Sequence, residues 1–387
     1  MTISFADRIR DVPRSFIREI LKDALQPGTI SFAGGLPNPD LFPVEELHDA
    51  SERTFTEYGK QLMQYSESEG FRPLRQWIVN RYQQQGITTT VDNVLITSGS
   101  QQGMDLLGKI FINDGDALVI EEPGYLGAIQ AFSLYRPMFY PVTLTEQGMD
   151  CEQLQQTLQT QKPKLLYTVP NFQNPSGITY PTANRQQVAE LVRHQNCLLI
   201  EDNPYGELRF SGEDQTSFAQ LLPGQCILLG TFSKTIVPGF RLGWIVAPDH
   251  LIDKLVTAKQ AADLHTNQML QCMVYQYLLH NNLDDHIRKI IAVYGRQKDA
   301  MIAAMEAFLP GEVNFTRPEG GMFLWATLSE GHSALDLFHR AAKEKVLFVP
   351  GDPFYINRTQ ANTLRLNFTC VNNETITEGI KRLGSLM

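Results

Sequence analysis

A lysine among small hydroxyl residues and glycines is the strongest candidate for covalent chemistry in the sequence. Lys234 follows an apolar run at 226–229, and Arg241 lies seven positions after the lysine. A lysine in a partly desolvated pocket near another cation has a lowered pKa and can form a Schiff base. The hydroxyls of Thr231 and Ser233 and the guanidinium of Arg241 are suited to phosphate oxygens. The segment predicts a covalent amine beside a bound phosphate; the alternative is a strand-to-loop junction with a solvated lysine.

The elements that would position these residues are visible from residue 91 onward. Short apolar runs alternate there with helical segments, which is the pattern of a mostly parallel α/β sheet. Seven runs are the expected strands: 94–97, 117–120, 138–142, 165–169, 197–201, 226–229 and 243–247. Ligands of such sheets bind just outside the carboxyl ends of the strands. The residues that follow each run are therefore the candidates for a site.

Polar and aromatic residues follow several of these runs. Ser100 and Gln101 open a helix after the first run, where free N–H groups and the positive end of the helix dipole suit a phosphate. A serine at that position can also cap the helix without any ligand. An aromatic ring, an amide, a carboxylate and a phenol follow later runs: Tyr125, Asn174, Asp202 and Tyr205. Each of them taken singly is more typical of a turn than of catalysis.

Together, these residue types match the needs of pyridoxal 5'-phosphate. A carboxylate such as Asp202 pairs with the protonated ring nitrogen, while an amide and a phenol hold the ring oxygen. An aromatic side chain stacks on the ring, and Lys234 holds the aldehyde carbon. The sequence therefore predicts a pyridoxal-phosphate site at the carboxyl edge of the sheet.

The pattern changes after about residue 280. A long amphipathic helix at 284–308 is followed by partly antiparallel strands, and a strand at 363–368 precedes the final helix. This composition of elements indicates a second, smaller α+β unit. Because the chain is longer than one compact core usually holds, we expect a large cofactor-binding domain at 51–279 and a small domain built from both chain ends, 1–50 and 280–387.

Two further positions are candidates for substrate contact. Arg365 stands in an otherwise apolar alternation, and a lone inward arginine needs an anion. Its partner is either a protein carboxylate or a substrate carboxylate, and both remain open. Gly34, Gly35 and Leu36 lie in a turn that either lets backbone approach a ligand or is a plain surface turn. We interpret His265 as a helix or interface histidine rather than a ligand or catalyst.

Composition argues against several classes of partner. The chain has 387 residues, a net charge of −9, 43% hydrophobic and 19% charged residues, and no basic block. This balance disfavours nucleic acid or anionic membrane as the main partner. The five cysteines are scattered without metal-ligand spacing, so we expect no metal site and a reduced, cytoplasmic compartment. No apolar run reaches transmembrane length, and the N-terminus lacks a signal-peptide core.

With these residues assembled, the sequence resembles a fold type I, pyridoxal-phosphate-dependent aminotransferase of class I/II, closest to the 2-aminoadipate and kynurenine aminotransferase group. Matching motifs run in the family's order from SFIRE at 15–19 through FAGGLP at 32–37 to LRLNF at 364–368, over nearly the whole chain. The broader class places the phosphate arginine eight positions after the lysine, whereas the spacing here is seven, as in the 2-aminoadipate-like branch. The resemblance implies an α/β fold with a mostly parallel seven-stranded sheet flanked by helices.

The resemblance also implies a role for each candidate. Lys234, Asp202 and Tyr205 would be catalytic: the lysine forms the Schiff base and moves the proton, and the aspartate pairs with the ring nitrogen. Further cofactor contacts would be Asn174 and Tyr205 on the ring oxygen, Tyr125 on the ring face, Ser100, Gln101, Thr231, Ser233 and Arg241 on the phosphate, and Tyr65 from the other subunit of a homodimer. Substrate contacts would be Arg365 on the α-carboxylate, Gly35, Leu36 and Asn174 along the pocket, and Arg18 near its entrance or a distal carboxylate.

The implied reaction moves an amino group from an L-amino acid of 2-aminoadipate, aromatic or branched-chain type to a 2-oxo acid such as 2-oxoglutarate, in two half-reactions. A lyase or decarboxylase on the same fold would use the same lysine and aspartate, so it stays open. A non-catalytic regulator would carry an N-terminal DNA-binding domain, for which motifs starting by residue 15 leave no room. Arg18 favours acidic donors, unless it is a surface arginine paired with Glu19 or Asp23.

Overall fold

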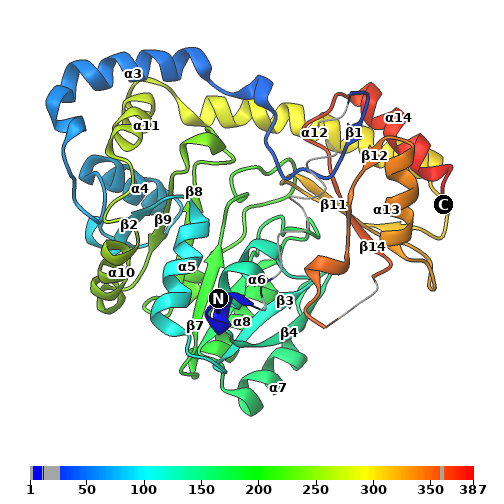
Figure 1. Ribbon diagram of the computed structural model, residues 1–387, viewed down its shortest axis with the longest axis horizontal. Helices are drawn as coiled ribbons and strands as arrows, with labels where there is room; N and C mark the ends of the chain where they lie inside the picture. Colours follow the sequence, from blue (N-terminus) through cyan, green and yellow to red (C-terminus); the bar gives the residue numbers. More distant parts are fainter. Residues whose placement is uncertain (1–2, 11, 13–26, 358–360) are drawn as a thin grey trace.

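The computed structural model describes residues 3–10, 12, 27–357 and 361–387. Figure 1 shows a large part with a central sheet and, at the right, a smaller part that holds the last strands and helices. Segments from both halves of the chain meet in the smaller part, because β1 (Ile30–Ser31) pairs in parallel with β12 (Val346–Leu347). Helix α3 (Val44–Tyr58) spans the predicted boundary at residues 50 and 51. The domain boundaries themselves stay a prediction.

The central sheet contains all seven predicted strands, in the order β2-β9-β8-β7-β6-β3-β4-β5. Its members are β2 (Val94–Thr97), β3 (Ala117–Glu122), β4 (Met138–Thr145), β5 (Gly148–Met149), β6 (Leu165–Thr168), β7 (Leu198–Asp202), β8 (Cys226–Thr231) and β9 (Gly243–Val246). Neighbours from β8 through β4 are parallel, and β9 is antiparallel to both β2 and β8. The sheet has eight strands rather than seven, because β5, two residues paired with β4, is too short to show a periodicity.

Alternation of side chains along the strands builds a core on each face of the sheet. Leu118 and Ile120 of β3 pack on one face, together with residues of α5 (Ser100–Phe111) and α6 (Leu126–Ser133). Val119, between them, packs on the other face with residues of α7 (Cys151–Gln161) and α8 (Thr182–Arg193). Since both faces are covered, the strands carry continuous apolar runs, which is why they were recognisable.

The other helices surround this sheet and lead to the smaller part. They are α1 (Asp7–Arg10), α4 (Arg72–Gln84), α9 (Phe218–Leu221), α10 (Asp249–Ala262) and α11 (Gln268–His280). Buried residues of α3, α4 and α11 form one cluster with the edge of the sheet at β2 and β9. Helix α12 (Leu283–Phe308) then runs across to the smaller part (Figure 1).

The smaller part is built on an antiparallel sheet in the order β10-β11-β14-β13. Its elements are β10 (Asn314–Phe315), β11 (Phe323–Thr327), α13 (Ala334–Lys343), β13 (Val349–Pro350), β14 (Thr363–Asn367) and α14 (Asn373–Gly384). Helix α13 buries one stripe, Ala334, Leu337, Phe338 and Ala341, at the spacing of a helix face. Arg365 lies in the central strand β14, opposite Trp325 on one side and Val349 on the other.

Within the described residues, no helix is both long and apolar enough to cross a membrane. The five cysteines are all free thiols, and Cys197, Cys226 and Cys272 are buried. Burial raises the pKa of the Cys197 thiol to about 12, so this cysteine behaves as a core residue rather than a nucleophile.

Candidate active site

The carboxyl ends of the strands bring the predicted residues to one edge of the sheet. Asp202 is the last residue of β7, and Thr231 is the last residue of β8. Ser100 begins α5 shortly after β2, and Tyr125 precedes α6 after β3. Tyr125 is within electrostatic reach of both Asp202 and Arg365. These candidates therefore form one site, and not a series of independent turns.

Asp202 is buried, and only one of its two carboxylate oxygens is satisfied. Tyr167 donates a hydrogen bond of 2.6 Å from its hydroxyl to Oδ2, whereas Oδ1 has no partner among the described residues. Burial raises the pKa of Asp202 to about 7; the bond from Tyr167 opposes this rise, and the nearby charge of Glu121 adds to it. A buried, unsatisfied carboxylate oxygen requires a donor, and a protonated ring nitrogen is such a donor.

Asn174 connects the ring side of the site to the substrate side. Its Nδ2 donates to the hydroxyl of Tyr205 at 3.3 Å, and its Oδ1 accepts from Nη1 of Arg365 at 2.8 Å. Nη2 of Arg365 donates to the carbonyl of Ala33 at 2.8 Å. The guanidinium also lies 4.4 Å from the centroid of the Phe323 ring. The amide and the phenol that were predicted to hold the ring oxygen are therefore adjacent.

Arg365 is a buried cation with no carboxylate partner in the described part of the chain. Its side chain is 2% exposed, and its Nε makes no hydrogen bond there. Burial lowers its pKa to about 10, and the groups that oppose this are the phenols Tyr205 and Tyr125, not carboxylates. Of the two partners left open by the sequence, the protein carboxylate is not found among the described residues. The guanidinium is thus available to an incoming anion.

Lys234 lies between these groups. Its Nζ donates to the carbonyl of Gly35 at 2.8 Å and lies 5.9 Å from the centroid of the Tyr205 ring. Burial lowers the pKa of the amine to about 8, the charges of Arg365 and Arg241 lower it further, and Cys370 opposes them. An amine with such a pKa is partly neutral near physiological pH, as a nucleophile or general base must be.

The hydroxyls, the helix start and Arg241 meet at the other end of the site. Gly99 precedes α5 with a φ of +80°, and a Cβ at this position would collide with the guanidinium of Arg241. The first turn of α5 has no side-chain cap, so its N–H groups are not used by a capping residue. Thr231 donates from Oγ1 to Oγ of Ser233 at 2.8 Å. This arrangement of donors at a helix N-terminus suits a phosphate.

Gln101 links α5 to α6, because its Nε2 donates to the carbonyl of Gly127 at 2.9 Å. Tyr125 lies just before α6 and is half-buried. The residues present thus fit pyridoxal phosphate on two independent observations. One is the unsatisfied oxygen of Asp202, and the other is the uncapped helix start beside Arg241.

Not all the predicted residues come together within one chain. The Tyr65 side chain is 79% exposed, and its ring packs edge-on against His265 with 6.1 Å between centroids. Nδ1 of His265 donates to the carbonyl of Thr266 at 2.9 Å, as a structural histidine does. Leu36 is exposed, and its carbonyl accepts a bond from Thr369. Arg18 and the rest of the 15–19 motif lie outside the described residues.

Two buried residues were not predicted: Tyr167, which bonds Asp202, and Glu121, which bonds Gln173 next to Asn174. Tyr167 lies within a run that was taken as a purely apolar strand, yet its hydroxyl holds Asp202. Glu121 directly follows the predicted strand at 117–120 and was not among the candidates, but it is buried in β3, which extends to Glu122. The available signal is that a buried phenol or carboxylate in an apolar run requires a hydrogen-bond partner.

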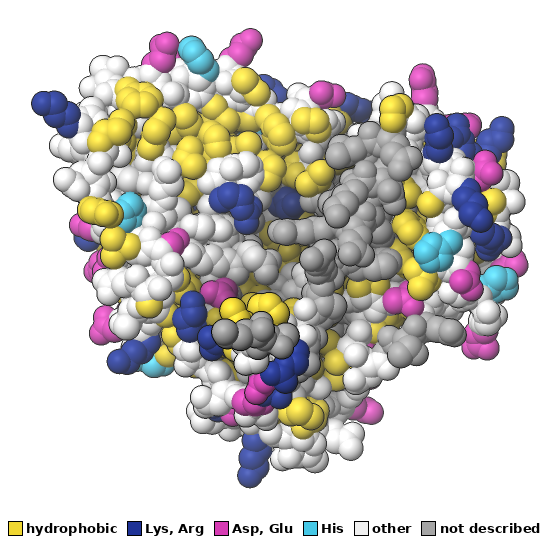
Figure 2. All heavy atoms as spheres, viewed as in Figure 1, with side chains coloured by type: hydrophobic (Ala, Val, Ile, Leu, Met, Phe, Trp, Pro, Cys, Tyr) yellow, Lys and Arg dark blue, Asp and Glu magenta, His cyan; other side chains and the backbone are white. Residues whose placement is uncertain are grey.

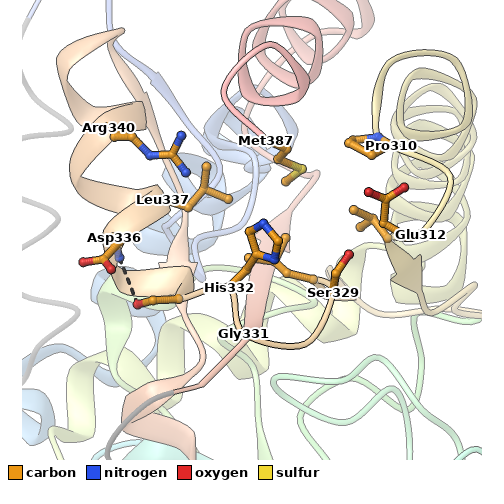
Figure 3. Close-up of a pocket in the computed structure, with 12 residues that line it drawn as sticks. Pro310, Glu312, Ser329, Gly331, His332, Asp336, Leu337, Arg340 and Met387 are labelled. Carbon is orange, nitrogen blue, oxygen red and sulfur yellow. Dashed lines mark hydrogen bonds between the residues drawn. The ribbon is translucent and has the colours of Figure 1, made fainter.

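A separate pocket lies in the smaller part of the molecule. Figure 3 shows His332 and Ser329 on the loop below this pocket, with Arg340 and Leu337 of α13 on one side and Glu312 on the other. Met387, at the end of the chain, also lines it. The lining includes none of the predicted site residues, so this pocket is distinct from the candidate active site.

Comparisons with known proteins agree with this geometry. The family model described as aminotransferase class I and II matches residues 33–383. The chain is 44% identical to aromatic-amino-acid aminotransferase 1 of Thermococcus litoralis, over 98% of this chain and 93% of that protein. It is 42% identical to 2-aminoadipate transaminase of Thermus thermophilus, over 96% and 94% of the two chains.

A solved structure gives the same result. The crystal structure of Pyrococcus horikoshii kynurenine aminotransferase, in complex with PMP and with kynurenine and its product, matches with a TM-score of 0.94 and 41% identity, over 99% of this chain and 96% of that chain. The lysine, the half-satisfied aspartate and the uncapped helix start thus lie in a framework shared with aminotransferases. The chain belongs to the aminotransferase class I and II family and is a fold type I, pyridoxal-phosphate-dependent aminotransferase.

Proposed function

We propose that the protein transfers the amino group of a 2-aminoadipate, aromatic or branched-chain L-amino acid to a 2-oxo acid such as 2-oxoglutarate. One observation carries this proposal: Lys234, whose pKa is lowered to about 8, lies near Arg365, a buried guanidinium without a carboxylate partner in the described residues. The lysine supplies an amine that exchanges protons near neutral pH, and the arginine suits the α-carboxylate of any amino acid. The names of the similar proteins support the donor classes.

Each residue of the site has a task in this reaction. The cofactor, when bound, supplies an electron sink that stabilises negative charge at the substrate α-carbon. Nζ of Lys234 takes the proton from that carbon, and its release from the carbonyl of Gly35 leaves it free to move. The unsatisfied Oδ1 of Asp202 would accept from the protonated ring nitrogen, and Tyr167 keeps this carboxylate in place.

The remaining residues orient the two reactants. Arg365 binds the α-carboxylate and Asn174 connects it to Tyr205, so ring and substrate are held by one hydrogen-bonded chain. Tyr125 would stack on the ring face. The helix start and the neighbouring donors would hold the phosphate: Ser100, Gln101, Thr231, Ser233 and Arg241. Gly35 and Leu36 line the substrate side.

An amino-donor panel with 2-oxoglutarate tests the function directly. We expect glutamate formation from 2-aminoadipate and from aromatic or branched-chain donors, measured by product chromatography. Release of ammonia or carbon dioxide without glutamate would show a lyase or decarboxylase instead. Inactivity with every donor, in protein shown to contain the cofactor by its visible absorbance, would contradict the proposed function.

A substitution at Arg18 tests whether acidic donors are recognised through their second carboxylate. If Arg18 meets that group, Arg18→Ala lowers kcat/KM for 2-aminoadipate and glutamate while it spares leucine and phenylalanine. Apolar donors present no second charge that could be left unpaired. Equal losses for both classes of donor would show that Arg18 has a structural role.

We also propose a homodimer in which Tyr65 completes the phosphate site of the partner. Figure 2 shows apolar side chains gathered over the upper left of the molecule, where Figure 1 places α3 and α11. Large exposed apolar residues on these elements and the turn that follows α3 are Val44, Phe55, Met63, Tyr65 and Leu279. A two-fold contact over this surface would bury them. Sedimentation checks this claim, since a fully active monomer would contradict it.

A cytoplasmic location is the third part of the proposal. Five free cysteines at scattered positions support a reducing compartment. Fractionation of the source cells with an antibody against the protein would check the location.

A further inference from the structure

Glu121 is a buried carboxylate that accepts four hydrogen bonds. Oε1 accepts from the hydroxyls of Thr168 and Tyr180, both at 2.6 Å, and from the backbone N–H of Val169 at 2.9 Å. Oε2 accepts from Nε2 of Gln173 at 3.0 Å. The side chain is 1% exposed, and it forms no ion pair among the described residues. Burial of a carboxylate without a cation costs free energy of folding. Packing alone therefore does not explain the presence of Glu121 at this position.

All four donors belong to the segment 168–180, which carries Asn174. Gln173, next to Asn174, is itself fully buried and uses its amide completely. Its Nε2 also donates to the carbonyl of Pro123 at 2.8 Å, and its Oε1 accepts from the N–H and hydroxyl of Ser176 at 2.8 and 2.7 Å. Through Gln173, Glu121 therefore joins the segment of Asn174 to the turn that leads to Tyr125.

A second buried charge holds the same segment from α8. Arg185 donates from Nε to the carbonyl of Tyr180 and from Nη2 to the carbonyl of Pro170, both at 2.9 Å. Nη2 also donates to Oδ1 of Asn171 at 2.6 Å. Arg185 and Glu121 do not pair with each other. Glu121 accepts all four of its bonds from this segment, and Arg185 makes three bonds to it and a fourth, from Nη1, to the carbonyl of Thr216 at 3.3 Å. Two such groups fix its backbone more firmly than a typical surface loop.

The rigid segment fixes the position of Asn174. This residue bonds Tyr205 on the cofactor side and Arg365 on the substrate side, so one displacement of the segment disturbs both contacts. A misplacement of about 1 Å in a site can cost about 10²-fold in rate. We propose that Glu121 is a positioning residue for transamination, which fixes the segment 168–180 and thereby the place of Asn174 between cofactor and substrate. This inference rests on the proposed role of Asn174.

The test is Glu121→Gln, which keeps the volume but places an amide N–H₂ where a donor now points. We expect kcat/KM to fall by about 10–100-fold for acidic and apolar donors alike, as for an indirect loss of geometry. A readout without turnover is cofactor affinity: the Kd of the cofactor-free protein for pyridoxal phosphate, from fluorescence titration, should rise by about 10-fold. If both quantities stay within twofold of the parent, the inference is wrong.

A matched control separates positioning from a general loss of stability. Glu201 is equally buried on β7, which β6 separates from β3 in the sheet. It accepts from the hydroxyl of Ser217 at 2.6 Å and from the N–H of Phe218 at 2.8 Å, at the start of α9. Glu201→Gln should lower the thermal midpoint by a similar amount and leave kcat/KM and the cofactor Kd within about twofold. Equal kinetic losses in both variants would overturn the inference. If Glu121→Gln does not fold, Tyr180→Phe removes a single bond to Glu121 and should give a smaller loss, about 3–10-fold.

A double-mutant cycle with Asn174→Ala identifies the route. If Glu121 acts through Asn174, the double variant should be no worse than Asn174→Ala alone, because the positioned group is already absent. Multiplicative losses would show that Glu121 acts elsewhere and would overturn this inference while the proposed function stands. An Asn174→Ala variant with parental kinetics and cofactor affinity would instead contradict the assigned role of Asn174, and the inference with it.

Discussion

The two ends of the active site are built by different means. The phosphate end takes most of its side chains from one segment: Thr231, Ser233 and Arg241 lie between the end of β8 and the start of β9, and Arg241 meets the start of α5. The carboxylate end joins residues that are far apart in sequence. Arg365 bonds Asn174 across 191 positions and Ala33 across 332 positions.

The environments of the two cations differ in the same way. Arg241 is exposed and its guanidinium lies beside Gly99 at the uncapped start of α5, so several donors would share an anion bound there. Arg365 is buried, and Lys234 is the cation whose charge interacts with it among the described residues. Loss of a shared, solvated donor is partly compensated by its neighbours and by water, whereas a buried charge has no substitute. Substitutions at the carboxylate end should therefore be more costly.

The largest effect is expected at Lys234, which lies between the two ends and feels both arginines. Loss of the general acid/base alone should cost about 10²–10⁴-fold in kcat, and loss of the covalent anchor adds to this. Lys234→Ala should also abolish fixation of the cofactor by borohydride, measured by mass spectrometry. Lys164→Ala, which removes a lysine paired with Asp116 outside the site, should leave fixation unchanged. Fixation on another lysine would refute the assignment.

The next largest effect is expected at the carboxylate end. A lost charge-assisted pair is worth about 1.5–3 kcal/mol, so Arg365→Ala should lower kcat/KM by at least about 10–100-fold for every donor. The matched control is Arg317→Ala, an exposed arginine of the same part of the molecule that pairs with Glu306. It should have no effect on any donor. A loss confined to acidic donors would mean that Arg365 meets a distal carboxylate instead.

A smaller effect is expected at the phosphate end. Arg241→Ala should raise the Kd for pyridoxal phosphate by about 10-fold, because a single charge-assisted contact with a solvated partner is lost. At saturating cofactor, kcat/KM should approach that of the parent. This recovery is the contrast with Arg365→Ala, whose defect should persist at any cofactor concentration. If excess cofactor rescued both variants equally, the two ends would not differ as we describe.

The smallest effect is a displacement of a pH profile. The pKa of Lys234 is lowered to about 8, so in cofactor-free protein the reactive neutral amine becomes more populated as the pH rises through 8. The rate of covalent attachment of pyridoxal phosphate should rise over the same interval. Arg365→Gln removes a charge that lowers this pKa, and the profile should move to higher pH. Stopped-flow absorbance measures the rate, and an unmoved profile would show that Arg365 does not tune the lysine.

The gathering of most candidate residues at one edge of the sheet could be predicted from the sequence because they follow recognisable strands. Asp202 and Thr231 end buried strands, and the parallel order then places them on one edge without further information. The pairing of Asp202 with Tyr167 could not be read, since a tyrosine inside an apolar strand looks like a core residue. Strand β5 was not predicted because a strand of two residues shows no periodicity.

The sequence by itself predicted the strands, the polar and aromatic side chains that follow them, and Lys234 as the candidate amine. It could do so because hydrophobic periodicity and turn residues are local properties. It left open whether the partner of Arg365 is a protein carboxylate or a substrate carboxylate. Only the tertiary structure decided this, by packing β14 beside Ala33 and Asn174 and bringing no carboxylate to the guanidinium within the described residues. The same holds for Glu121, whose four donors converge only when β3, β6 and the loop after β6 are assembled. Partners that lie far apart in sequence are set by the fold, since no local pattern encodes which buried charge will meet which donor.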